Sequence, residues 1–170
     1  MPVDAACVDT SVLVAYYCPE PLSDAAEAAL LGLREPCIST QTEVEFTSLI
    51  ARKRRMRELT ERSATEVLRL FGQHVADGHY RRLALGTEHF LRARPDRVAA
   101  ALATDLPVLT ADRPFARAAR RHDAAAIVVK QPAALLRHTT ASVPSTAGRN
   151  GAVSRRLKYH VQAPVFGSDC

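Results

Sequence analysis

The sequence predicts an α/β domain built on a mainly parallel sheet. Short apolar runs recur along the chain and alternate with longer stretches whose apolar residues follow helical spacing. This alternation is typical of parallel strands joined by crossover helices. The chain has 170 residues, enough for one compact domain and an extension, and no stretch approaches the roughly 20 apolar residues of a membrane-spanning helix.

The first half of the chain contains three predicted strands and the helices between them. An apolar run at 5–8 ends at Asp9, and two prolines interrupt the helical pattern that follows. In the helix at 43–55, Val44, Leu49 and Ile50 are expected on the apolar side. The predicted strands are 5–8, 36–39 and 79–85, and the predicted helices are 12–17, 23–33, 43–55 and 60–75.

The second half continues the alternation and then loses it. A helix is expected from Thr87, broken or restarted by Pro95, and it is followed by a strand at 107–110, a helix at 115–122 and a strand at 126–129. After Leu136 the chain is rich in Thr, Ser, Pro, Gly and Arg and has little apolar periodicity. We therefore expect one domain over residues 1–136 and a disordered basic tail over 137–170.

Charge and cysteine usage narrow the class of protein. Most of the net charge of +5 lies in the tail, whose segment 155–159 also offers an alternative role in touching RNA. Within the domain, the clusters at 52–57 and 117–121 are candidates for phosphate contacts or, equally, solvated helix faces.

The N-terminus has no signal-peptide pattern, which favours a cytoplasmic protein. In that reducing compartment, four scattered cysteines without a C-x-x-C pair are expected to be small buried hydrophobes, not disulfides or zinc ligands: Cys7, Cys18, Cys37 and Cys170.

Acidic residues stand where the chain leaves its predicted strands. Asp9 and Asp112 each follow an apolar strand and precede a helix, the position at which parallel sheets form a functional crevice. Both residues also suit a helix N-cap. Two capping boxes are possible in the next helix, Thr40 with Glu43 and Thr42 with Glu45, so one glutamate is spare for chemistry. Carboxylates that converge repel one another unless a cation neutralises them, and such oxygen ligands suit Mg²⁺ or Mn²⁺, which activate water for attack on a phosphodiester.

Three motifs in series resemble the PIN-domain family, and in particular its VapC-type toxin ribonucleases. Asp9-Thr10-Ser11 is similar to the N-terminal signature, in which a strand-ending Asp and the next Ser or Thr begin the metal site. The segment from Glu45 to Lys53 is similar to the pattern around the second acid, which selects Glu45 over Glu43. The segment from Leu106 to Arg117 is similar to the last acidic motif, around Asp112. The resemblance covers residues 3 to about 130 and implies a three-layer α/β/α domain around a mainly parallel sheet.

The third acid of the family departs from the usual pattern. VapC proteins carry a Leu-Arg-x-x-Asp segment before the fourth strand, and the corresponding residues here are 91–102. Counting back from Asp112 by the family's usual spacing between the two acids reaches Arg94. Asp96 is therefore the third ligand only if its helix starts about two residues late. A deletion of roughly 20 residues before this segment would account for the shift. Asp105 is a poorer alternative, because it precedes the fourth strand at the end of the sheet away from the crevice.

The resemblance implies a metal-dependent endoribonuclease toxin that cleaves structured RNA such as tRNA or rRNA. Its ligands to Mg²⁺ or Mn²⁺ would be Asp9, Glu45, Asp96 and Asp112, and its implied partners are a VapB-like antitoxin and a second copy of the chain. The altered third motif favours an alternative, a degenerate PIN fold that binds RNA or an antitoxin without cutting. A signalling receiver domain would explain Lys130 near the last strand, but the paired acids expected after its first strand are absent.

Overall fold

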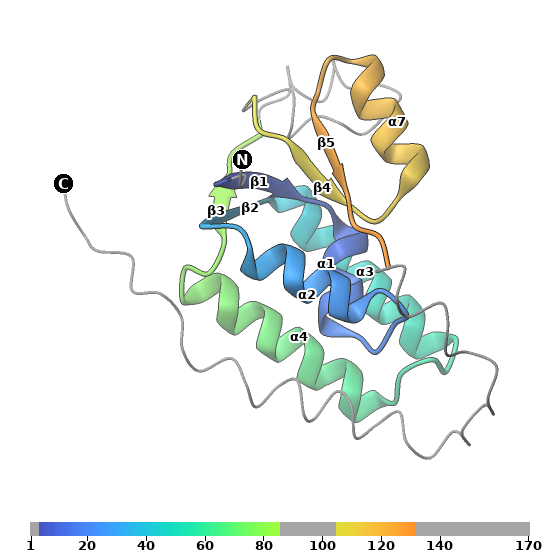
Figure 1. The fold of residues 1–170 in the computed structure, drawn as a ribbon. Helices are drawn as coiled ribbons and strands as arrows, with labels where there is room; N and C mark the ends of the chain where they lie inside the picture. Colours follow the sequence, from blue (N-terminus) through green and yellow to red (C-terminus); the bar gives the residue numbers. More distant parts are fainter. Residues whose placement is uncertain (1–3, 86–104, 132–170) are drawn as a thin grey trace.

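Five parallel strands form the central sheet of the computed structural model, which describes residues 4–85 and 105–131 (Figure 1). Their order is β3-β2-β1-β4-β5, and every neighbouring pair is parallel. The predicted α/β class is therefore confirmed. The strands are β1 (Ala5–Val8), β2 (Glu35–Ser39), β3 (Arg81–Leu83), β4 (Val108–Thr110) and β5 (Ala126–Val128).

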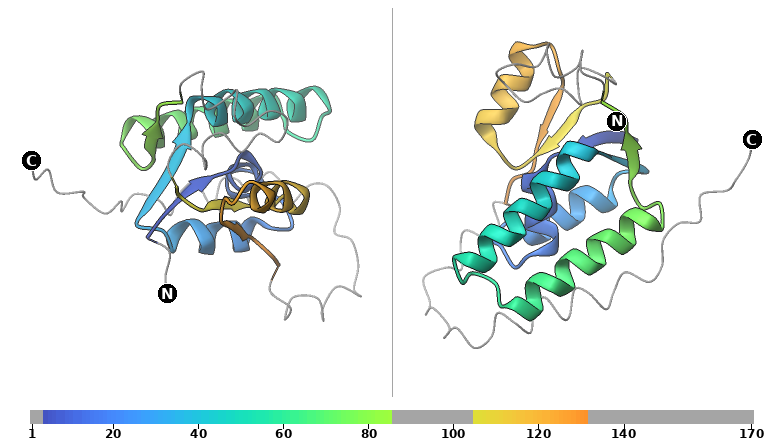
Figure 2. Two further views of the ribbon diagram at one scale, coloured as in Figure 1. Left: turned by 90° about the horizontal axis from the view of Figure 1, so that it is seen from above. Right: turned by 180° about the vertical axis from the view of Figure 1, so that it is seen from behind.

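Helices connect the strands and flank the sheet. In the views of Figures 1 and 2, α3 and α4 lie side by side, while α7 lies beside β4 and β5 at the end of the molecule away from α4. The helix expected from Thr87 and the tail at 137–170 fall outside the described residues. The described helices are α1 (Thr10–Tyr17), α2 (Ser23–Leu31), α3 (Thr40–Arg55), α4 (Glu61–Ala76) and α7 (Arg113–Arg121).

Alternating strand residues divide the core between the two faces of the sheet. Ala6, Val8, Ile38 and Leu109 join the main cluster, to which α1, α2, α3 and α4 all contribute. Their neighbours point the other way, where Val108 packs with Ala119 of α7, and Cys7 and Cys37 pack with Leu83. Because other elements cover both faces of a parallel sheet, its strands are buried on both sides. This explains why the strands are uninterrupted apolar runs in the sequence.

The start of α3 differs from the prediction. Ser39 caps the helix by accepting a hydrogen bond from the Thr42 backbone N–H at 3.2 Å, so α3 begins at Thr40 and both expected capping boxes are wrong. The earlier start also changes the buried face: Phe46 and Ile50 are fully buried, whereas Val44, expected inside, is 61% exposed. Neither glutamate of this first turn and a half is used as a cap.

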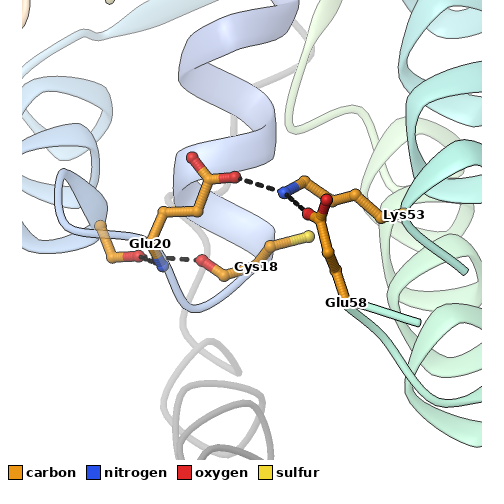
Figure 3. Close-up of polar contacts among 5 residues, drawn as sticks. Cys18, Glu20, Lys53 and Glu58 are labelled. Carbon is orange, nitrogen blue, oxygen red and sulfur yellow. Dashed lines mark hydrogen bonds and ion pairs between the residues drawn. The ribbon is translucent and has the colours of Figure 1, made fainter. Parts of the chain in front are cut away.

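The basic cluster at the end of α3 is partly structural. The Lys53 Nζ lies 2.8 Å from a carboxylate oxygen of Glu20 and 2.8 Å from one of Glu58, as Figure 3 shows. Burial lowers the pKa of Lys53, but the hydrogen bonds to Glu20 and Glu58 and the negative charges of these residues together outweigh that effect and raise it. Lys53 therefore ties the α1–α2 connection to the end of α3.

Three of the cysteines are free and buried, as predicted, while Cys170 lies outside the described residues. Burial raises the pKa of the Cys18 thiol to about 12, and it also raises the pKa of Cys37. Thiols of this kind stay protonated and unreactive at neutral pH. Among the described residues, no helix is long and apolar enough to cross a membrane.

Candidate active site

The strand order reverses at β1, and this reversal positions the candidate site. The chain passes from β1 to β2 and β3 on one side and returns to β4 and β5 on the other. Val8 pairs in register with Leu109, so the residues that follow, Asp9 and Thr110, emerge together at the carboxyl ends of adjacent strands. Crevices at such switch points are the usual ligand sites of open parallel sheets.

Asp9 is held by its neighbours through one carboxylate oxygen. It is the N-cap of α1, and its Oδ2 accepts from the Ser11 backbone N–H at 3.3 Å, from the Ser11 hydroxyl, and from the Thr110 hydroxyl at 2.8 Å. Oδ1 accepts no hydrogen bond from the described residues. The predicted cap and the predicted site residue are thus compatible, because capping uses one oxygen and leaves the other for a ligand.

Glu45 lies beside the first turn of α1. Its Oε2 accepts from the Thr10 hydroxyl at 3.0 Å, and its Oε1 accepts from the Gln41 side-chain amide at 2.9 Å. Glu43 behaves differently, since its carboxylate faces Arg82 of β3 at 3.4 Å. Of the two glutamates, Glu45 is therefore the one brought next to the residue that follows Asp9.

Asp112 is exposed at the start of α7, two residues beyond β4. Its Oδ1 accepts from the Phe115 backbone N–H at 3.1 Å, and Pro114 occupies the first turn, as the capping interpretation predicted. The Asp112 backbone N–H in turn donates to the Thr110 hydroxyl at 2.9 Å. Thr110 thus contacts both aspartates of the site.

The three carboxylates have no cationic partner among the described residues. Within residues 4–85 and 105–131, neither Asp9, Glu45 nor Asp112 forms an ion pair with Lys, Arg or His. This contrasts with six other glutamates of the described residues, which pair with lysine or arginine at 2.8–3.4 Å: Glu20, Glu35, Glu43, Glu58, Glu61 and Glu66. In a chain of net charge +5, unpaired carboxylates at one edge of the sheet provide a place for a cation.

A model of the PIN domain family matches residues 6–121 of the sequence. The chain belongs to the PIN domain family. Among solved structures, the crystal structure of PAE2754 from Pyrobaculum aerophilum is similar at 19% sequence identity, over 69% of this chain and 87% of that chain, with a TM-score of 0.44. No curated protein gives a significant sequence match.

Membership of the PIN family points to nuclease activity, because PIN domains are generally metal-dependent nucleases. The donor set agrees with that chemistry, since carboxylates and hydroxyls are hard oxygen donors that suit Mg²⁺ and Mn²⁺. In the described part of the PIN domain, however, no three acidic, histidine or cysteine side chains are grouped closely enough to hold a metal ion by themselves. The carboxylates lie at the same edge of the sheet, but among the described residues they do not form a complete set of metal ligands.

The predicted third ligand of this PIN domain, Asp96, lies outside the described residues. Asp105 lies three residues before β4, with a φ of 53°. It therefore stands at the opposite end of that strand from Asp112, which is the position expected for it from the sequence.

Two residues that position the carboxylates, Thr110 and Gln41, were not predicted as site residues from the sequence. Thr110 is fully buried and polar at the end of an apolar strand, which is a signal that a buried hydrogen bond is needed there. Gln41 precedes Glu45 by four residues, the spacing at which helical side chains meet. Both signals are present in the sequence, but each is common in proteins without an active site.

Proposed function

We propose that this PIN domain is a VapC-type toxin, a metal-dependent endoribonuclease that cleaves structured RNA such as tRNA or rRNA. The observation that carries the proposal is the set of carboxylates at the switch point of the sheet, Asp9, Glu45 and Asp112, which have no ion pair with any residue that the structure describes. A VapB-like antitoxin that silences the enzyme and a homodimeric state belong to the same proposal, and so does Asp96 as a further ligand.

The proposed chemistry assigns each residue a task. Asp9, Glu45, Asp96 and Asp112 would hold Mg²⁺ or Mn²⁺, which when bound acidifies water and offsets charge on the phosphodiester. Ser11 and Thr110 fix the Asp9 carboxylate by donating to Oδ2, and Thr10 and Gln41 fix Glu45. Because these donors hold the carboxylates before the cation arrives, little reorganisation is needed on binding.

A pair of glutamate variants tests the proposal. Wild-type protein is expected to cleave tRNA or rRNA with Mg²⁺ or Mn²⁺ and to stop when EDTA removes the metal. Glu45→Gln, which keeps the shape and removes the charge, is expected to lower the cleavage rate by at least about 100-fold and to weaken Mn²⁺ binding in calorimetric titration.

Glu43→Gln is the matched control. It makes the same change two residues away and breaks only a partly exposed ion pair with Arg82, so cleavage is expected to stay within about twofold of the wild-type rate. Equal loss in both variants, or cleavage that persists in EDTA, would refute the proposed metal chemistry.

The alternative function is a degenerate PIN domain that binds RNA or an antitoxin without cutting. It is favoured by the absence of a group of three close metal-binding side chains among the residues described. The two functions differ in metal titration: the enzyme binds Mn²⁺ in the micromolar range and loses that binding in Asp96→Ala, whereas the binding module holds RNA without Mn²⁺ and has no such site.

A further inference from the structure

One face of α7 consists of arginine. With about 100° of rotation per residue, Arg113, Arg117, Arg120 and Arg121 fall within an arc of about 100°. The opposite side is small and buried, with Ala116, Ala118 and Ala119 against the sheet. Short alanines bring the helix close to β4 and β5, and the long arginine side chains remain outside.

Among the described residues, Arg113 and Arg117 lack the ion pairs that several other basic residues form. In the part of the chain that the structure describes, neither forms an ion pair with a carboxylate, whereas Lys53, Arg54, Arg69, Arg81 and Arg82 all do. Arg120 and Arg121 are in the last turn, where the helix dipole favours cations. Arg113 is in the first turn, where the dipole disfavours a cation, so helix stability does not account for it.

The position of these residues connects them to the candidate site. α7 begins directly after Asp112, so Arg113 is next to a predicted ligand and Arg117 lies about 6 Å further along the axis. Lys130 leaves β5 at the same edge, because it follows Val128 by two residues just as Asp112 follows Thr110, the register partner of Val128. Lys130 also has no ion pair among the described residues. In contrast, the cluster at the end of α3 lies about 10 Å or more beyond Glu45 along that helix.

We propose that Lys130, Arg113 and Arg117 form a phosphate track, along which the backbone of an RNA strand runs from the carboxylate site over the outer face of α7. The inference deepens the proposed ribonuclease function and rests on it for the identity of the ligand. Exposed guanidinium groups without carboxylate partners are available to phosphate, to which they donate paired hydrogen bonds. In α3 and α4, by contrast, Lys53, Arg54 and Arg69 would first have to break their ion pairs with glutamate.

The test is the salt dependence of RNA binding, measured without cleavage. The full chain is titrated with fluorescein-labelled tRNA in EDTA at several NaCl concentrations, and the slope of log K against log [salt] is determined. R113Q/R117Q is expected to reduce the magnitude of this slope by about 1.4 to 1.8, from about 0.7 to 0.9 per lost phosphate contact. Affinity is expected to fall to a similar extent for unrelated RNA sequences, because phosphate contacts carry no sequence information.

R62Q/R69Q is the matched control, because it removes the same charge from exposed positions of α4, at the other end of the molecule (Figures 1 and 2). Its slope is expected to match that of the wild type. Equal slopes for R113Q/R117Q and the control, or no tRNA binding by the wild type, would overturn the track. Failure of the ribonuclease function can be distinguished from failure of the track. If the slope falls as expected but the wild type does not cleave tRNA with Mg²⁺ or Mn²⁺, the phosphate track is supported and the ribonuclease function is refuted.

Discussion

Replacing Asp9 with asparagine is expected to lower RNA cleavage by about a thousandfold or more while leaving the fold intact. The carboxylate charge at the end of β1 is proposed to hold the cation, and an amide oxygen holds it far more weakly. A bound metal contributes several kcal/mol to the stabilisation of the transition state, and each 1.36 kcal/mol corresponds to tenfold in rate. The measurement is the rate of cleavage of a defined RNA under single-turnover conditions.

The asparagine variant is chosen because it preserves the structural role of Asp9. Its carbonyl oxygen can take the place of Oδ2 and accept from the hydroxyls of Ser11 and Thr110. Asparagine is also among the preferred N-caps, so α1 keeps its cap and the melting temperature is expected to change by at most a few degrees. Asp77→Asn, the same change at the exposed C-cap residue of α4, controls for the loss of one negative charge.

Cleavage by Asp9→Asn above a tenth of the wild-type rate would show that Asp9 is not a metal ligand. A large fall in melting temperature would instead assign the residue a structural role beyond its cap. Because rate and stability are measured on the same preparation, these two outcomes are distinguished.

The largest effect on stability is expected for Phe46→Ala, at about 3–5 kcal/mol of the free energy of unfolding. Phe46 is fully buried, and its ring centroid lies 4.4 Å from that of Phe71 and 5.4 Å from that of Tyr17. It therefore joins α3 to α4 and to α1. Truncation would leave a cavity between three helices that already pack against the sheet and cannot collapse freely.

Chemical denaturation measures the loss, and the melting temperature is expected to fall by on the order of 10 °C. Val44→Ala is the matched control on the same helix, because Val44 is 61% exposed and its truncation should cost less than about 0.5 kcal/mol. Similar losses for the two variants would contradict the observed rotation of α3 and favour the apolar face predicted from the sequence.

The parallel sheet and the positions of Asp9 and Asp112 could be predicted because they depend on local patterns. A buried parallel strand is an uninterrupted apolar run, and the polar residue after it marks where the chain leaves the sheet. Both patterns can be recognised in the sequence without knowledge of tertiary contacts. The same reasoning placed β4 and β5 to within one residue of their observed bounds.

The helix after β2 could not be placed accurately from the sequence, since three possible caps, Ser39, Thr40 and Thr42, follow one another closely. Tertiary packing decided among them: burial of Phe46 against α1 and α4 fixes the rotation of α3, which turns Val44 outward. β3 is also shorter than the predicted 79–85, and the residue before it, Tyr80, is buried with its hydroxyl 3.0 Å from that of Tyr17.

The division of the glutamates was predicted only by resemblance to a family. Spacing along α3 leaves Glu43 and Glu45 equivalent, because both fall in its first turn and a half. What separates them is a contact with residues far along the chain, Arg82 for Glu43 and Thr10 for Glu45. Such contacts depend on strand order, which no local pattern encodes.

The most direct test of the proposed site is a crystal structure of the full chain grown with Mn²⁺, in which the anomalous scattering of manganese locates the ion. A peak is expected at the carboxyl ends of β1 and β4, with direct oxygen ligands at roughly 2.1 Å from Asp9 and Asp112 and with Glu45 and Asp96 completing the set. A well-ordered structure at saturating Mn²⁺ with no peak at this edge, or with Mn²⁺ bound only elsewhere, would contradict it.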